Sequence, residues 1–257
     1  MVGVTNGPSV LNPFYFGDSA RQLFGMYDPG GGGGERGAVV CHPWGQEYLR
    51  AHPSVRRLAR MLADRQVHAM RFDYYGCGDS AGDDRDGSVD QWRQDLAMAV
   101  TELRDMASLR KVSLVGLRFG AVLAATCATE REDLDRLVLW DPIFDGSAYV
   151  RELTAGRAGA GPDGAVQVRG FPLTGSVRDD MCAVTPAVFR RPLPPTLVVS
   201  TVAADTYGPL QRALREGGTD VVTAFCPGPR AWSADTDFAA AGMPVGALDR
   251  IADWIAA

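Results

Sequence analysis

The stretch Val112-Ser-Leu-Val-Gly-Leu-Arg-Phe-Gly-Ala-Val-Leu-Ala-Ala125 decides the fold of this 257-residue chain. Its first residues are apolar and β-prone, the turn Gly116-Leu-Arg-Phe-Gly120 follows, and an alanine-rich apolar segment comes next. This order predicts a strand, a tight turn and a helix. Glycines on both sides of the turn let the two backbones pass close to its central residue, which is Arg118.

Composition indicates one large globular α/β domain with 46% apolar and 22% charged residues. The net charge of −5 gives no electrostatic reason to expect a nucleic-acid or membrane partner. Five irregularly spaced cysteines suggest free thiols in a cytoplasmic protein, with no disulfide framework, metal site or cofactor. We see no signal peptide, and no apolar run reaches the roughly 18 residues of a membrane span.

Strands alternate with helices along most of the chain. We expect strands at 13–16, 22–27, 38–42, 69–73, 112–115, 137–140, 196–200 and 221–225. We expect helices at 54–65, 207–215 and 244–255, a helix capped by Ser88, and a helix that follows the turn and ends near Thr129. This alternation predicts a mostly parallel central sheet with helices on both faces.

Residues 145–194 break the alternation. We interpret them as a small cap inserted between a first part of the core (1–144) and a second part (195–257), all within one structural domain. The alternative is a surface excursion without a function.

The order of elements resembles the α/β-hydrolase fold, in which the turn reads Gly-x-Ser-x-Gly and carries the nucleophilic serine. Five motifs resemble the hydrolase-like proteins encoded beside exosortase systems, which also tend to carry arginine at this turn: His42-Pro-Trp-Gly-Gln-Glu47, Asp73-Tyr-Tyr-Gly-Cys-Gly-Asp-Ser80, Gly116-Leu-Arg-Phe-Gly120, Leu139-Trp-Asp-Pro142 and Arg169-Gly-Phe-Pro-Leu173. Hydrolase-like proteins of similar fold in polyketide tetronate pathways eliminate acetate from an acetylated intermediate.

The usual Ser–acid–His triad lacks two members. Arg118 holds the nucleophile position, and arginine is neither a nucleophile nor a base near neutral pH. Asp205 lies in the loop expected to carry the acid, but no histidine follows His68 in the chain. Cys77, in a glycine-rich turn, is an alternative nucleophile, although that turn is more simply a structural bend.

Two interpretations of Arg118 remain open. Its guanidinium points into the pocket and binds a carboxylate, an enolate or another anion through paired hydrogen bonds. Alternatively it pairs within the protein with Asp205 or Glu47. A buried arginine needs an anion in either case.

The loop that begins at His42 is expected to supply the part of hydrolase chemistry that stabilises an oxyanion. The backbone N–H groups of Trp44 and Phe119 are expected to form an oxyanion hole. His42 is a candidate acid or base, or a residue that orders the loop. Glu47 is a candidate base, a partner of Arg118, or a charge that favours the start of a helix.

Aromatic residues gather where predicted strands end, the edge at which open α/β sheets bind ligands. We expect Trp44, Tyr74, Tyr75 and Trp232 to form an apolar wall, with Asp141 at the end of a neighbouring strand. The expected ligand is a small molecule that carries a carboxylate or another anion; the oligomeric state is left open.

The resemblance to acetate-eliminating proteins implies a lyase that eliminates a carboxylate such as acetate from a polyketide-type intermediate, with Arg118, Glu47, His42 and Asp205 as catalytic candidates. A ligand-binding protein without activity is one alternative. An esterase or thioesterase with a non-standard nucleophile is the other.

Overall fold

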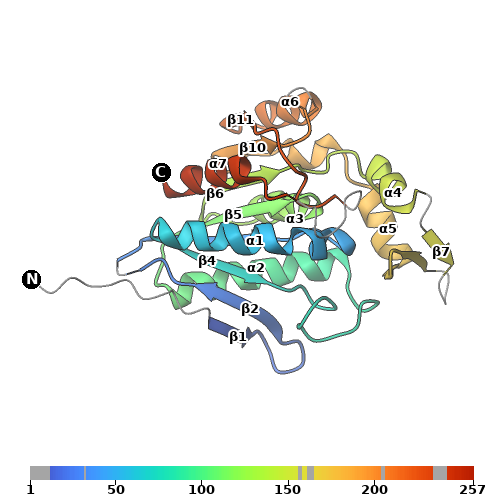
Figure 1. Cartoon of the computed structure of the whole chain (residues 1–257), viewed down its shortest axis with the longest axis horizontal. Coiled ribbons are helices and arrows are strands. Elements are labelled where there is room, and N and C mark those ends of the chain that lie inside the picture. The colour runs from blue at the N-terminus through green and yellow to red at the C-terminus, as the bar shows by residue number, and fades with distance from the viewer. Residues whose placement is uncertain (1–11, 32, 156–157, 161–164, 204–205, 234–241) are drawn as a thin grey trace, which may run out of the picture.

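A computed structural model shows an eight-stranded sheet in the centre of the molecule (Figure 1). The structure describes residues 12–31, 33–155, 158–160, 165–203, 206–233 and 242–257. In spatial order the strands are β1 (Asn12–Phe16), β2 (Leu23–Asp28), β4 (Val67–Phe72), β3 (Arg36–Cys41), β5 (Val112–Leu117), β6 (Leu134–Trp140), β10 (Thr196–Ser200) and β11 (Val221–Phe225). Pairing is antiparallel from β1 to β4 and parallel from β4 to β11.

Helices cover both faces of this sheet. The buried side chains of α1 (Gln46–Asp64) and α7 (Val245–Ala256) belong to one hydrophobic cluster. Those of α2 (Val89–Met106), α3 (Phe119–Ala128) and α6 (Gly208–Glu216) belong to the other. Strand β5 is buried along its whole length, as expected for a central parallel strand. These layers confirm the predicted α/β-hydrolase fold.

The segment between β6 and β10 forms elements outside the central sheet. It contains α4 (Gly146–Thr154), a three-stranded antiparallel sheet of β7 (Ala158–Ala160), β8 (Val166–Val168) and β9 (Phe171–Leu173), α5 (Gly175–Cys182) and a 3₁₀ helix (Pro186–Phe189). In Figure 1, α4, α5 and β7 lie together at one side of the molecule. The role of this segment as a cap stays a prediction.

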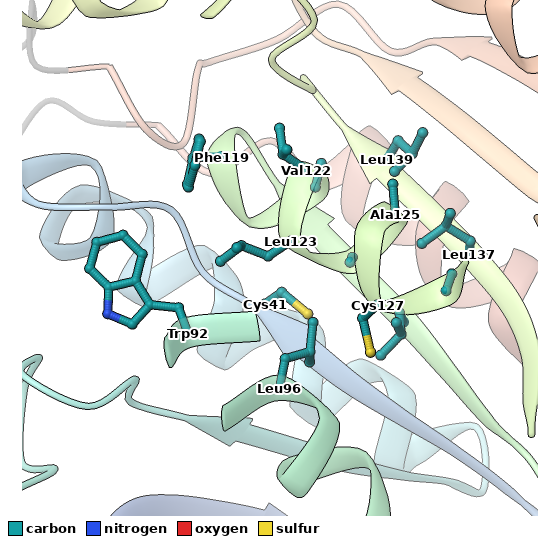
Figure 2. Packing of buried hydrophobic residues seen from close by; sticks show 14 of the residues in the cluster. Cys41, Trp92, Leu96, Phe119, Val122, Leu123, Ala125, Cys127, Leu137 and Leu139 are labelled. Atoms are coloured by element: carbon teal, nitrogen blue, oxygen red, sulfur yellow. The ribbon is translucent and has the colours of Figure 1, made fainter. Parts of the chain in front are cut away.

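Helix α3 is buried on nearly every side because nine of its ten residues are inaccessible. Figure 2 shows its apolar side chains between those of α2 and the strands, with Leu96 and Leu139 on opposite sides. A Cβ added at Gly120 would lie 2.4 Å from the carbonyl oxygen of Cys41 and 2.5 Å from that of His42. The start of α3 therefore touches the backbone that leaves β3, which explains the glycine in the turn.

We expect Gly120→Ala to destabilise the protein by about 3 kcal/mol, since backbone oxygens cannot move aside as a side chain can. The measurement is urea unfolding at neutral pH. Gly246→Ala is the matched control, because Gly246 lies near the start of α7 with open space around its added Cβ. That control should leave the free energy of unfolding unchanged or slightly higher. Equal results for both variants would contradict close contact at α3.

Two expectations about local structure need correction. Helix α1 begins at Gln46 and continues through Pro53, whereas the sequence suggested a start at residue 54, after the proline. Glu47 therefore lies within the first turn of the helix and not ahead of it. Helix α4 was not foreseen; Asp145 caps its start by accepting a hydrogen bond from the N–H of Ala148 at 2.8 Å.

All five cysteines are free thiols in the structure. In the part of the chain that the structure describes, none of the helices is both long and apolar enough to cross a bilayer. Among the same residues, no cluster of three or more histidine, cysteine or acidic side chains is arranged to hold a metal ion.

Candidate functional site

The turn between β5 and α3 holds Arg118 in a strained backbone conformation, with φ at 54° and ψ at −118°. Residues other than glycine rarely adopt a positive φ, and such backbone strain is typical of functional positions. Gly116 makes the turn possible, since an added Cβ there would lie 2.4 Å from the Cα of Ala121. The local geometry is that of a nucleophile elbow with a guanidinium in place of the nucleophile.

The Arg118 side chain is buried and meets two carboxylates. Its Nε donates to Oε1 of Glu47 at 3.0 Å, and its Nη2 donates to Oε2 of Glu152 at 3.0 Å. The guanidinium carbon lies 3.7 Å from the ring centre of Trp232 and 5.2 Å from that of Tyr149, within the range of cation–π attraction. Of the two internal partners considered for Arg118, Glu47 is the one found, while Asp205 lies outside the described residues.

Glu47 is the buried carboxylate of the cluster. Its second oxygen, Oε2, accepts a hydrogen bond from the hydroxyl of Tyr149 at 2.9 Å. Burial raises the pKa of Glu47, and the attraction of Arg118 offsets this only in part. Burial also opposes the charge on Arg118, but Glu47, Tyr149 and Glu152 outweigh that effect and raise its pKa. Glu47 is thus more basic than an exposed glutamate, while Arg118 stays charged.

Backbone donors lie beside this cluster. No described residue accepts a hydrogen bond from the N–H of Trp44 or from that of Phe119, the first residue of α3. The contact of Gly120 with Cys41 and His42 brings the start of α3 against the loop that contains Trp44. An oxyanion hole requires such donors to converge on one oxygen. The oxyanion hole itself stays a prediction.

Trp44 separates two small cavities. One, of about 90 Å³, is lined by Trp44, Glu47, Glu152 and Trp232 among others. The other, of about 160 Å³, is mainly apolar and has Trp44, Leu49, Cys77, Phe171 and Pro172 in its lining. A charged cavity and an apolar cavity therefore meet at the residue expected to supply an oxyanion donor.

Cys77 lies in the apolar cavity but is poorly suited to attack a substrate. Burial and the nearby carboxylates of Asp73, Asp84 and Asp95 raise the pKa of its thiol to about 12. The thiolate, which is the reactive form, is therefore scarce at neutral pH. This supports the structural interpretation of the glycine-rich turn.

His42 is buried between Tyr48 and Tyr74, with ring centres 4.3 and 4.4 Å away. Its Nδ1 lies 2.8 Å from the carbonyl oxygen of Pro43, which can only accept, so Nδ1 carries the proton. Nε2 is buried and has no hydrogen-bond partner among the described residues. Both the loop-ordering role and a role as a base are compatible with this geometry.

We expect His42 to lower the stability of the protein in acid. Burial lowers its pKa below the ordinary 6.5, although Asp73 opposes the shift. The unfolded chain then binds a proton that the native state does not, so the free energy of unfolding should fall as the pH decreases from about 7 to 5. His42→Gln should reduce this slope in urea unfolding at several pH values. Burial shifts the pKa of His52 the same way, so His52→Gln is the comparison; an unchanged slope in His42→Gln would contradict the expectation.

The other predicted site residues divide between the cluster and the core. Trp232 stacks on Arg118 as described above. Tyr74 is buried against Phe72, with ring centres 4.9 Å apart, and Tyr75 is half-buried, its N–H bound to Asp95 at 2.8 Å. Neither tyrosine is in the lining of the two cavities beside Trp44: Tyr74 packs within the core, and Tyr75 packs against it. Their place in a substrate site stays a prediction.

Asp141 is fully buried and orients its neighbours. Its carboxylate accepts hydrogen bonds from the N–H of Thr201 at 2.8 Å, the hydroxyl of Thr201 at 2.5 Å and Nε1 of Trp232 at 3.1 Å. The hydroxyl of Tyr207 lies 3.4 Å from it. Asp141 therefore holds Trp232 in place over Arg118, and it does not line either cavity beside Trp44.

Sequence reasoning missed Tyr149 and Glu152. Both come from α4, three residues apart, so that they share one side of the helix. Their segment showed no motif that linked it to Arg118. The only available signal was a polar residue and an aromatic residue at helical spacing in an inserted segment.

Comparisons with known proteins agree with this fold. The family model Hydrolase_4, described as serine aminopeptidase, S33, matches residues 38–166, just over half of the chain. No match was found among curated proteins.

Several solved structures are similar over almost their whole length. Est1E from Butyrivibrio proteoclasticus with bound ferulic acid is 16% identical, with a TM-score of 0.67 over 95% of this chain and 96% of that one. DcsB in complex with its substrate analogue is 16% identical, with a TM-score of 0.66 over 96% and 98%. The Pyrococcus furiosus esterase Pf2001 is 13% identical, with a TM-score of 0.62 over 96% and 90%. At these identities the likeness establishes the fold alone. Together with the family match and the elbow between β5 and α3, it shows that the chain belongs to the Hydrolase_4 (serine aminopeptidase, S33) family of α/β hydrolases.

Proposed function

We propose that the protein hydrolyses a small carboxylic ester or thioester, with water activated by Glu47 in place of a serine nucleophile. The observation that carries this proposal is the position of Glu47, a buried carboxylate of raised pKa in the lining of a cavity beside Trp44. The likeness to the Pyrococcus furiosus esterase Pf2001 supports ester chemistry over the elimination that the sequence favoured.

The reaction needs few groups. The substrate carbonyl oxygen accepts hydrogen bonds from the N–H groups of Trp44 and Phe119, which stabilise the developing oxyanion. Glu47 takes a proton from water as the water oxygen bonds to the carbonyl carbon. The bond to the leaving oxygen or sulfur then breaks, and the proton passes from Glu47 to that atom. The products are an alcohol or thiol and a carboxylic acid, whose ionised form Arg118 stabilises.

The substrate would carry its acyl carbonyl near Trp44 and an apolar group in the cavity of about 160 Å³. A cavity of about 150 Å³ with apolar walls takes a molecule the size of benzene, so this one fits a single ring or a short chain. The free thiols also fit our proposal of a cytoplasmic location.

Elimination of a carboxylate is a second candidate, and the resemblance to acetate-eliminating proteins of tetronate pathways belongs with it. The charge of Arg118 favours this candidate, because it lies close to the cavity where a leaving carboxylate would be released. Glu47 would then take a proton from the carbon next to the carbonyl, the enolate oxygen would lie in the oxyanion hole, and the carbon–oxygen bond to the carboxylate would break.

The two reactions differ in whether the oxygen of water enters the product. We would incubate the protein with aryl acetates, an acetyl thioester and a β-acetoxy ketone in water labelled with oxygen-18, and identify products by mass spectrometry. Hydrolysis places the label in the released acetate, whereas elimination gives unlabelled acetate and an alkene. A fluorophosphonate probe should not label any serine; labelling abolished by one serine substitution would contradict the role of Glu47. Absence of turnover on every substrate would favour a ligand-binding protein without activity.

A further inference from the structure

We infer that Glu152 occupies a subsite for a small carboxylate and leaves it when such a ligand binds. The inference rests on the proposed function only for the origin of the ligand, which is the carboxylate product of hydrolysis. The binding itself is independent of turnover.

The two carboxylates around Arg118 are held very differently. The side chain of Glu47 is 9% exposed and is fixed from both sides by Arg118 and Tyr149. The side chain of Glu152 is 53% exposed, and among the described residues Nη2 of Arg118 is its only hydrogen-bond partner. An ion pair with one half-exposed member contributes little, no more than about a fivefold change in an equilibrium. Glu152 is therefore the member that can be displaced.

Displacement opens a path from the cavity to the guanidinium. Glu152 lines the cavity of about 90 Å³, whereas Arg118 does not. The Glu152 side chain thus contacts both the cavity and Nη2 of Arg118. A carboxylate that enters the cavity can replace it oxygen for oxygen, and Arg118 keeps a hydrogen-bonded anion throughout.

Room is available for a small ligand only. Water takes about 30 Å³ per molecule in the liquid, so a cavity of about 90 Å³ holds a carboxylate with one or two carbons. Helix α4 does not need to move, because Tyr149 anchors it by stacking on Phe119 with ring centres 6.2 Å apart. A change of side-chain rotamer at Glu152 is sufficient.

Charge explains why Glu152 would matter for turnover. Arg118 carries one positive charge against two carboxylates, so Glu152 is in excess once the product carboxylate forms nearby. Its return to Nη2 expels the product. Glu152 therefore acts on release of the carboxylate and does not take part in bond breaking.

The test is acetate binding by isothermal titration calorimetry at pH 7, with ionic strength held constant by chloride. Glu152→Gln should bind acetate about fivefold more tightly than the native protein, or better, because it removes a like charge and leaves only a neutral amide oxygen to compete for Arg118. Glu152→Asp keeps the charge but is one methylene shorter, and it should bind acetate with intermediate affinity. Glu132→Gln, an exposed glutamate elsewhere, should match the native protein.

Each outcome of the titration either supports or contradicts the subsite at Glu152. An unchanged or weaker affinity in Glu152→Gln, or no acetate binding in any form, would overturn the inference. If Glu152→Asp matches the native protein while Glu152→Gln binds more tightly, repulsion acts alone and the displaced contact is wrong. Tighter binding without any ester turnover would support the subsite and reject the proposed function, whereas turnover with unchanged binding would do the reverse.

Discussion

Replacement of Glu47 by glutamine is expected to lower kcat/KM for ester hydrolysis about 10²- to 10⁴-fold, the range lost with a general base. Glutamine keeps the shape of the side chain and can still accept a hydrogen bond from Arg118 or Tyr149, but it cannot take a proton from water. The measurement is initial-rate kinetics on whichever ester or thioester proves to be a substrate in the labelling experiment.

The dependence of the rate on pH should change as well. Glu47 must be ionised to act, and burial raises its pKa above the ordinary carboxyl value of 4.5. The rate of the native protein should therefore fall as the pH decreases through that raised pKa, and this decline should vanish in Glu47→Gln. Glu132→Gln serves as the control for loss of a glutamate charge. A Glu47→Gln rate within threefold of native, in a protein that is still folded, would rule out Glu47 as the base.

The sequence predicted the fold best where a close backbone contact restricts which residue can occupy a position. Gly116 and Gly120 are needed because main-chain atoms lie within 2.5 Å of the position of an added Cβ. Only glycine, which has no Cβ, fits such a position. The strand, the turn and the helix could therefore be located from these two glycines and the residues around them. The burial of β5 likewise followed from its unbroken apolar run.

Contacts between side chains far apart in the sequence could not be predicted in this way. Glu152 reaches Arg118 from a position 34 residues further along the chain, in a segment without a recognisable motif. Its spacing from Arg118 depends on how the inserted elements fold, which local patterns do not encode. The partner that was foreseen, Glu47, was accessible to reasoning because the loop after β3 and the elbow meet at the same edge of every such sheet.

Aromatic residues at the ends of strands were also ambiguous from sequence. Tyr74 and Trp232 both follow strands, yet Tyr74 packs into the core and Trp232 covers Arg118. What separates them is a hydrogen bond from Trp232 to Asp141, a residue 91 positions earlier in the chain. Burial of an aromatic ring is thus predictable, but the choice between core and cavity depends on contacts that only the folded chain creates.

Loss of the Arg118 charge is expected to cost more stability than any other single change in the cluster. Arg118→Met should lower the free energy of unfolding by about 3–5 kcal/mol, because it leaves Glu47 buried without its counter-charge. The methionine also gives up the stacking on Trp232. Urea unfolding at pH 7 measures the effect, and Arg178→Met, an exposed arginine, should stay within about 0.5 kcal/mol of native.

The reason for the loss can be checked by pH and by a second substitution. Without Arg118, the pKa of Glu47 rises further, so the native state takes up a proton more readily than the unfolded chain, whose carboxyl has its ordinary pKa of 4.5. Stability is then retained below that value and lost as the pH increases through the raised pKa, so the cost of Arg118→Met should be smaller at pH 5 than at pH 8. Adding Glu47→Leu should restore most of the lost free energy, since removal of both charges leaves no unpaired ion. A cost that is independent of pH and unaffected by the second change would instead assign the loss to packing of the methionine.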